Sequence, residues 1–279
     1  MKKRDFQGVV CGNSDVLLDK LIGEGYQYDL ILTDPPYNLK KDFGNNSDNL
    51  ALNDFVEVTN ERILKLKKLL KKEGSIIWFG IHDYICYAQI AMIKSGLHYR
   101  RMNIWHYENG FSRSKKEPAT QYEPFLWFSN DAKKWTYNVD EVRIPYKSSE
   151  RLKNPIKYKT SSGEEKIWKP NVKGAMRGDI WEFPTLAGKC FEKERTDHPT
   201  QKSEKLFAKL ILASSKIGDK IYEPFAGVCT AGVVANKLGR NYTCVEFENE
   251  YCEIGQYRLD KSNINKNIQG YEDGIFRDK

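Results

Sequence analysis

Residues 28–38 read Tyr-Asp-Leu-Ile-Leu-Thr-Asp-Pro-Pro-Tyr-Asn, and this stretch decides which fold we expect of the whole chain. The apolar run from Leu30 to Leu32 is typical of a strand that is buried on both faces of a parallel sheet. Two prolines then end the strand, because neither can donate a backbone N–H and each restricts the residue before it. We therefore expect a stiff loop at the carboxyl end of a strand, where open α/β sheets bind their ligands.

The groups on this loop suit a planar base that carries an exocyclic amino group. The carboxylate of Asp34 and a proline carbonyl can accept the two amino hydrogens, and the ring of Tyr37 can stack on the base. The alternative is an ordinary prolyl turn in which Asp34 only caps the following residues. The complete run Asp-Pro-Pro-Tyr-Asn after an apolar strand favours base binding.

The composition describes a folded protein with a basic balance. The chain has 279 residues, of which 40% are hydrophobic and 13% aromatic, and its net charge of +7 favours a polyanionic partner. The six cysteines are scattered without a Cys-x-x-Cys pair, so we expect reduced thiols, with neither a metal site nor a disulfide framework. The N-terminus lacks the apolar stretch of a signal peptide and no run approaches transmembrane length, which predicts an intracellular, cytoplasmic protein.

Short apolar segments alternate with amphipathic ones along most of the chain, which predicts a mostly parallel sheet. We expect strands near residues 9–11, 28–33, 75–79, 99–106, 124–128, 220–222 and 241–246. We expect helices after Asn13 or Ser14, over 53–72 with Gly74 at the end, over 83–95, from Ser203, after 227 and from about 249. Residues 40–49 are predicted to be a mobile loop, and the polar tail after Lys261 is predicted to fray.

Residues 220–246 read as a strand, a turn with Gly227, a helix and a second strand that ends in Glu246. In nucleotide-binding units of this kind the turn admits the ligand to the backbone, and the acid binds ribose hydroxyls. The turn lacks both Gly-x-Gly-x-x-Gly and the Lys-Ser/Thr of a P-loop, which disfavours a dinucleotide or a triphosphate. An adenosine ligand without phosphates fits better, and S-adenosyl-L-methionine is the obvious one.

Basic and aromatic residues are interleaved without periodicity between residues 130 and 178. Such a mixture suits a surface that grips phosphates and stacks bases. A solvated, disordered insertion is the alternative, but aromatic residues are rare in disordered segments. We therefore expect this stretch to contact DNA.

Three segments resemble the motifs of bacterial DNA amino-methyltransferases of the β group. Residues 34–37 resemble their Asp-Pro-Pro-Tyr catalytic motif, residues 223–227 their Asp-Pro-Phe-x-Gly cofactor motif, and residues 196–202 their His-Pro-Thr-Gln-Lys-Pro segment. The order of catalytic motif, insertion and cofactor motif is also similar to that group. The resemblance covers about residues 9–128 and 178–258.

The resemblance implies an α/β, Rossmann-like S-adenosylmethionine-dependent methyltransferase fold, with a mostly parallel seven-stranded sheet, helices on both faces and a basic insertion. Residues 1–129 and 179–265 would form the catalytic domain, 130–178 the target-recognition insertion and 266–279 a tail. The implied reaction is site-specific methylation of the adenine N6 amino group in double-stranded DNA after base flipping, with S-adenosyl-L-homocysteine as product and no metal. A cognate restriction endonuclease and a homodimer stay open.

The resemblance also assigns roles to residues. The catalytic group is Asp34, Pro35, Pro36 and Tyr37. The cofactor group is Asn13, Ser14, Asp34, His198, Thr200, Gln201, Lys202, Glu223, Pro224, Phe225, Ala226, Gly227, Cys229, Thr230, Glu246 and Phe247. Within it, Glu246 would hold the ribose, and Thr200 and Lys202 the methionine carboxylate. The DNA-binding group is Lys40, Lys41, Arg113, Lys115, Lys133, Lys134, Arg143, Lys147 and Arg151, and no metal ligand is expected.

Some positions depart from the family pattern. Glu223, Val228 and Cys229 stand where the family usually has Asp, Ser and Gly. Cys229 adopts a positive φ less readily than glycine, so we expect either a different turn or some strain in it. His198, flanked by Pro199, reads as a hydrogen-bonded turn residue rather than a general base. Cytosine-N4 methylation uses the same geometry, although relatives that perform it more often have Ser before Pro-Pro-Tyr. A catalytically weak DNA-binding relative is the alternative from a different class.

Overall fold

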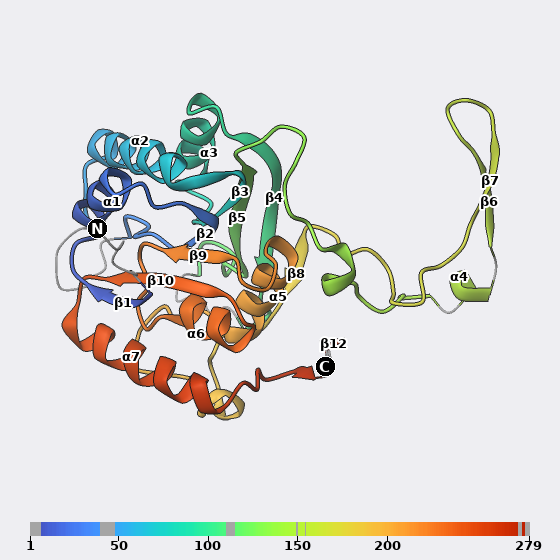
Figure 1. Ribbon diagram of the computed structural model, residues 1–279. Coiled ribbons are helices and arrows are strands. Elements are labelled where there is room, and N and C mark those ends of the chain that lie inside the picture. The colour runs from blue at the N-terminus through green and yellow to red at the C-terminus, as the bar shows by residue number, and fades with distance from the viewer. Residues whose placement is uncertain are drawn as a thin grey trace.

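The computed structural model describes residues 7–39, 48–109, 115–148, 150–153, 155–272 and 275–276. In these ranges eight strands form one sheet in the order β1-β10-β9-β2-β3-β5-β4-β8 (Figure 1). The strands are β1 (Gly8–Cys11), β2 (Tyr28–Thr33), β3 (Leu70–Phe79), β4 (His98–His106), β5 (Tyr122–Ser129), β8 (Ile180–Glu182), β9 (Lys220–Glu223) and β10 (Asn241–Glu246). Only β5 runs antiparallel to its neighbours in this sheet. The mostly parallel α/β sheet is confirmed, and β8 adds one strand to the seven expected.

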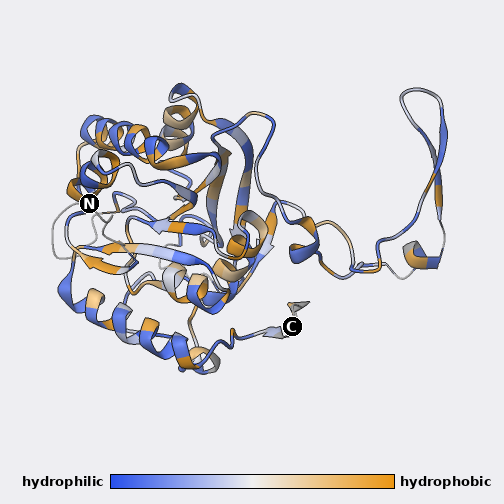
Figure 2. Cartoon of the chain, in the orientation of Figure 1, coloured by the Kyte–Doolittle hydropathy of each residue, from blue (hydrophilic) through white to orange (hydrophobic). Residues whose placement is uncertain are grey.

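Helices cover both faces of the sheet. Residues of α1 (Ser14–Gly23), α2 (Leu52–Leu69) and α3 (Ile85–Lys94) form one core cluster, and α5 (Glu204–Ser214) and α6 (Thr230–Lys237) belong to a second. Ile31 joins the first cluster whereas Leu30 and Leu32 join the second, because successive strand residues point to opposite faces. Apolar colour accordingly marks much of the sheet and the adjoining helices (Figure 2). None of the described helices combines the length and apolarity needed to cross a bilayer.

Two helix starts follow the predicted capping chemistry. Asn13 is the N-cap of α1, and its Oδ1 accepts the N–H of Asp15 at 2.8 Å. Ser203 is the N-cap of α5, and its hydroxyl accepts the N–H of Leu206 at 3.3 Å. Both caps bring an element to the edge of the ligand pocket described below.

The prediction that Gly74 ends the long helix is wrong. The helix α2 stops at Leu69 and β3 begins directly at Leu70, so Gly74 lies within the strand. A Cβ at this position would lie 3.1 Å from the carbonyl oxygens of both Tyr28 and Lys71. The glycine is therefore required by the close approach of β2, and not by a helix end.

The termini correct two further predictions. Cys11 and Cys252 form a disulfide, with their Cα atoms 5.9 Å apart, although we expected reduced thiols. The two residues are 241 positions apart, and only the packing of α7 (Asn249–Ile264) against β1 brings them together. The tail is partly ordered, since Ile268 is buried and β11 (Tyr271–Glu272) pairs with β12 (Ile275–Phe276).

An arm projects from the body between β5 and β8 (Figure 1). It carries α4 (Glu150–Lys153) and a hairpin of β6 (Ile156–Lys159) and β7 (Glu165–Trp168), which form a separate two-stranded sheet. The segment before the arm is anchored, because the side-chain amide of Asn138 donates to the carbonyls of Leu212 in α5 and of its C-cap Ser215. Val142 in the same segment is buried in the core. The remaining short elements are the 3₁₀ turns Val139–Val142 and Lys189–Phe191.

Candidate active site and cofactor pocket

One pocket brings together motifs that lie far apart in the sequence. It lies where β1, β2, β9 and β10 end, and it is lined by the predicted catalytic residues Asp34, Pro35, Pro36 and Tyr37. The predicted cofactor residues on its wall are Asn13, Ser14, His198, Thr200, Gln201, Lys202, Glu223, Pro224, Phe225, Ala226, Gly227, Thr230, Glu246 and Phe247. Cys229 is buried beside the wall residue Val228. The fold thus brings the two predicted groups to one cavity.

The cofactor side of the pocket is built on the turn at Gly227. Its backbone N–H donates to Oε2 of Glu246 at 2.7 Å, and its φ is +50°. A Cβ here would lie 2.8 Å from Nε2 of His198, so the close approach requires glycine. Burial raises the pKa of Glu246, although backbone N–H groups of Glu248 and Gly227 oppose that shift. The acid at the end of β10 is thereby fixed beside the turn.

Residues 194–202 form the second wall of the pocket through their own hydrogen bonds. Oε1 of Gln201 accepts the backbone N–H and the hydroxyl of Thr196, both at 2.8 Å. Nδ1 of His198 accepts the N–H of Thr200 at 3.3 Å, and the His198 ring packs edge-on against Tyr251 at 4.5 Å. This geometry confirms that His198 is a hydrogen-bonded turn residue.

A cluster of four polar groups lies at the side of the pocket with the predicted catalytic loop, and Asp34, Tyr37 and Lys202 of this cluster line the pocket. Nζ of Lys202 lies 2.8 Å from Oδ2 of Asp34 and 3.1 Å from Oε2 of Glu123. The hydroxyl of Tyr37 donates to Oδ1 of Asp34 and lies 3.2 Å from Oε2 of Glu123. The Lys202 side chain is only 4% exposed, and the two carboxylates are 17% and 20% exposed. The cluster is therefore a largely buried network of paired charges.

The charges in this cluster keep their partners in defined protonation states. Burial lowers the pKa of Lys202, but the carboxylates of Asp34 and Glu123 outweigh it and the net pKa is raised. Burial and the same two carboxylates hold the pKa of Tyr37 well above its ordinary value. Lys202 is consequently an ammonium and Tyr37 a neutral hydrogen-bond donor at neutral pH.

Comparison with known proteins assigns the family. A family model described as DNA methylase matches residues 28–257. The chain belongs to the DNA methylase family. It is 32% identical over 255 residues to the type II methyltransferase M.HpaI of Haemophilus parainfluenzae, covering 91% of this chain and 74% of that protein. It is also 31% identical to the DNA adenine methyltransferase YhdJ of Escherichia coli (strain K12), covering 90% of this chain and 82% of that protein.

Solved structures agree with the fold of this DNA methylase. The M1.HpyAVI–SAM complex matches with a TM-score of 0.64 and 21% identity, covering 91% of this chain and 98% of that one. The cytosine-N4-specific PvuII DNA methyltransferase matches with a TM-score of 0.67 and 17% identity, covering 93% and 89%. At these identities the likeness concerns the architecture alone.

The turn of this DNA methylase is strained at Cys229, which is one of the two outcomes that the departure from the family pattern left open. Cys229 is the N-cap of α6 with φ 59° and ψ 37°, a left-handed conformation that favours glycine. Its side chain packs against Gly255 of α7, where a Cβ would lie 3.1 Å from that of Cys229. The strain is retained because the surrounding helices hold the residue in place.

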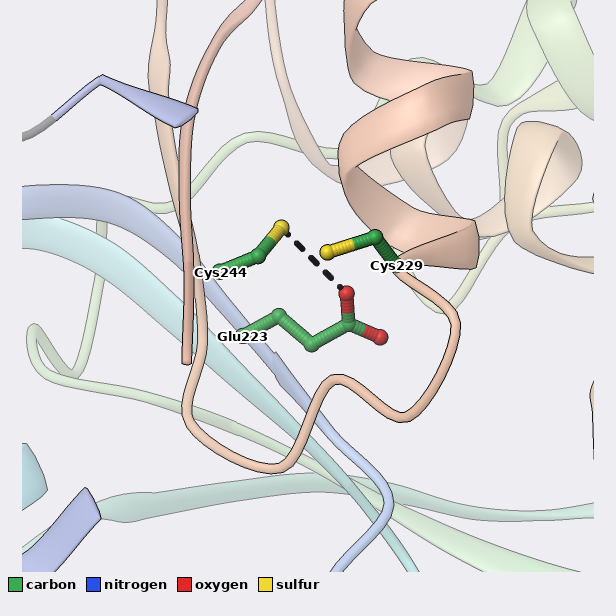
Figure 3. Close-up of side chains that lie close together, drawn as sticks. All are labelled: Glu223, Cys229 and Cys244. Atoms are coloured by element: carbon green, nitrogen blue, oxygen red, sulfur yellow. Dashed lines mark hydrogen bonds between the residues drawn. The ribbon is translucent and has the colours of Figure 1, made fainter. Parts of the chain in front are cut away.

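Cys229 also belongs to a buried group with Glu223 and Cys244 (Figure 3). One ligand-type atom from each lies within 4.8 Å of the others, and Sγ of Cys244 donates to Oε2 of Glu223 at 3.5 Å. We expected no metal site from the sequence, and only the tertiary structure brings these residues together. Burial raises the pKa of all three groups.

Four residues at the site carried no signal in the sequence analysis. Glu123 completes the Lys202 cluster, and Tyr251 packs on His198. Arg62 pairs with Asp15 at 2.8 Å, and its guanidinium lies 4.9 Å from the centre of the Phe225 ring. Asp48 accepts the backbone N–H of Leu39 at 2.9 Å and so holds the end of the catalytic loop.

The predicted DNA-binding residues fall into three groups. Lys40, Lys41 and Arg113 lie outside the described residues, as do most of the predicted mobile loop and the side chain of Arg151. Lys115, Lys133, Lys134 and Lys147 are exposed. Arg143 is engaged within the protein, since its guanidinium bonds Asp140 at 2.7 Å and the carbonyl of Gly174 at 3.0 Å. Arg143 therefore braces the base of the arm.

Proposed function

We propose that this DNA methylase transfers a methyl group from S-adenosyl-L-methionine to the N6 amino group of adenine in duplex DNA. The observation that carries the proposal is the single pocket shared by Asp34 and Glu246, one at the end of β2 and the other at the end of β10. The resemblance of the catalytic loop to adenine enzymes supports the choice of base, as does the 31% identity to a protein named a DNA adenine methyltransferase.

The pocket fits an adenosine ligand that has no phosphates. Glu246 offers carboxylate oxygens to ribose hydroxyls, and Phe225 supplies an apolar wall. The ring of His198 lies so close to Gly227 that no side chain fits at position 227. The bound cofactor supplies a methyl group already activated by its sulfonium. The assignment of Thr200 and Lys202 to its carboxylate stays a prediction, because the Lys202 ammonium contacts Asp34 and Glu123 here.

The residues on the catalytic loop orient the nucleophile. The amino nitrogen of adenine is a poor nucleophile, since its lone pair is delocalised into the ring. Hydrogen bonds from this amino group to Asp34 and to the carbonyl of Pro35 would favour a pyramidal nitrogen whose lone pair is available. Stacking on Tyr37 would hold the flipped base in place. Alignment and electrostatics of this kind can supply most of the rate enhancement.

The arm is the part of the molecule best suited to hold the duplex. An isolated two-stranded hairpin is at most marginally stable by itself in water. This hairpin exposes Ile156, Tyr158 and Ile167 among lysines, which suits contact with a phosphate backbone and with bases. The boundaries 130–178 for a target-recognition insertion, and the exposed lysines near the base of the arm, belong to this proposal.

The test is incubation of the purified protein with labelled S-adenosyl-L-methionine and mixed-sequence duplex DNA, followed by nucleoside analysis. We expect N6-methyladenine, and we expect the product to vanish with Asp34→Ala. Asp54→Ala removes an exposed carboxylate on α2 and serves as the matched control with unchanged product. Recovery of N4-methylcytosine would overturn the base assignment. Absence of any methylated nucleoside, despite measurable cofactor binding, would overturn the proposed activity on duplex DNA.

A further inference from the structure

Both oxygens of the catalytic carboxylate already have partners within the protein. Oδ2 of Asp34 pairs with Nζ of Lys202 at 2.8 Å, and Oδ1 accepts the hydroxyl of Tyr37. A carboxylate oxygen can accept two hydrogen bonds, but the Tyr37 hydroxyl occupies one of the two lone-pair directions of Oδ1. An amino group that approaches along that direction displaces the hydroxyl, which then needs another acceptor.

Glu123 provides that second acceptor. Its Oε2 lies 3.2 Å from the Tyr37 hydroxyl, so a small rotation of the tyrosine transfers the hydrogen bond from Asp34 to Glu123. Lys202 pairs with the same Oε2 at 3.1 Å, which keeps the Glu123 carboxylate beside the tyrosine. The pKa of Tyr37 is raised by burial and by both carboxylates, so the hydroxyl keeps its proton in either position.

We propose that Glu123 is a positioning residue, which accepts the Tyr37 hydroxyl and thereby frees Oδ1 of Asp34 for the amino group of the target base. Lys202 meanwhile holds Oδ2 and fixes the direction of the carboxylate. This inference rests on the proposed function, because it concerns the same amino group. No proton is transferred in this exchange. The hydrogen bond from Tyr37 to Asp34 is replaced by one from Tyr37 to Glu123.

The inference predicts that Glu123 controls how strongly the protein recognises an amino group. The measurement uses S-adenosyl-L-homocysteine, with which no methyl transfer occurs, and a duplex that contains the target site mapped with the wild type. Affinity for this duplex is compared with affinity for the same duplex carrying unsubstituted purine at the target position. A hydrogen bond to a carboxylate gives a preference of about tenfold for adenine.

Four variants test the exchange of partners. Glu123→Ala removes the second acceptor, so the adenine preference is expected to fall close to one. Tyr37→Phe keeps the ring but removes the competing hydroxyl, so the double variant Glu123→Ala with Tyr37→Phe is expected to regain the preference. Glu123→Gln keeps an oxygen acceptor and covers the case in which alanine prevents folding; its preference is expected to stay within about threefold of the wild type. Glu182→Ala, an exposed acid on β8, is the control without effect.

A merely structural role of Glu123 gives a different result. In that case the effects of the two substitutions on the adenine preference would be additive. Adding Tyr37→Phe to Glu123→Ala would then restore neither the adenine preference nor the single-turnover rate. A full adenine preference in Glu123→Ala would also overturn the inference. Failure of the proposed function would be evident earlier, as missing N6-methyladenine with the wild type, whereas failure of this inference leaves that product intact.

Discussion

Oε2 of Glu246 accepts the backbone N–H of Gly227 at 2.7 Å, so the acid at the end of β10 and the turn after β9 form one unit. The same turn faces His198, whose Nε2 would lie 2.8 Å from a Cβ at position 227. The cofactor wall is thus assembled from three segments in mutual contact. A change at Gly227 is transmitted to both of its neighbours.

Gly227→Ala is expected to weaken binding of S-adenosyl-L-methionine by about tenfold, because its Cβ displaces the His198 ring or the turn itself. Gly218→Ala is the matched control. Its φ is also positive, at +83°, but no atom lies within 4 Å of the added Cβ. Both variants should lose about 1 kcal/mol of unfolding free energy to the left-handed backbone. Equal cofactor affinities by titration calorimetry would contradict the assigned contact.

Cys229→Gly is expected to be more stable than Cys229→Ala by about 1 kcal/mol, because only glycine relieves the left-handed conformation. Both substitutions delete the thiol, so the packing lost with the sulfur cancels in the comparison. The same pair at Cys244, which lies in β10 without a positive φ, should give the opposite order, since glycine weakens a strand interior. Urea unfolding of the four variants measures both differences. Matching orders at the two sites would refute the strain at Cys229.

Stability is expected to fall as the pH rises from about 4.5 to about 7 through the carboxyl of Glu194. Burial, together with the carboxylate of Glu204, raises the pKa of Glu194 to about 7. Between the unfolded and the folded pKa only the folded state holds the proton, so deprotonation favours unfolding. The contribution of Glu194 to the free energy of unfolding is fully present below the pKa of this group in the unfolded chain. The loss of this contribution at higher pH should amount to about 2 kcal/mol after allowance for solvent screening.

Glu194→Gln should flatten this part of the pH profile, because the amide keeps an oxygen acceptor for the N–H of Glu204 but cannot ionise. Glu192→Gln, on an exposed neighbour, should leave the profile unchanged. Thermal unfolding across the pH range is the measurement. An unaltered slope in Glu194→Gln would assign the pH dependence to another group.

Three hairpin lysines are expected to contribute to the salt dependence of DNA binding. Replacing Lys157, Lys159 and Lys166 by glutamine should lower the slope of log K against log salt by about 3, because each phosphate contact releases a counterion. Cofactor affinity should not change. The control replaces the exposed lysines Lys94, Lys216 and Lys261 of the body. Equal salt dependence in the two triple variants would show that the hairpin lysines do not contact the DNA phosphates.

Local sequence patterns were sufficient for the parts of the site that lie within one segment. The apolar run before Asp34 and its two prolines predicted the strand and the stiff loop. The glycine turn and the terminal acid Glu246 predicted the cofactor wall, and Asn13 and Ser203 predicted two helix starts. Each of these features depends on backbone chemistry and on neighbours a few residues away, which the sequence displays directly.

Local patterns failed where an element met a distant one. Gly74 was read as a helix end, although the approach of β2 places it inside a strand. The disulfide of Cys11 and Cys252 depends on how α7 packs beside β1. Periodicity and spacing in the sequence do not predict these long-range contacts, because the packing of whole helices and strands determines them.

The sequence by itself determined the α/β alternation, the family and the two motifs to which we assign the chemistry. Only the tertiary structure decided that Lys202 pairs with Asp34 and Glu123. Tyr37, on the same loop as Asp34, is 86 residues from Glu123 and 165 from Lys202 along the chain. A charged residue is recognisable in a sequence, but its partner is determined by folding, because a buried charge without a partner is strongly destabilising. The arrangement of the catalytic carboxylate therefore belongs to the folded protein.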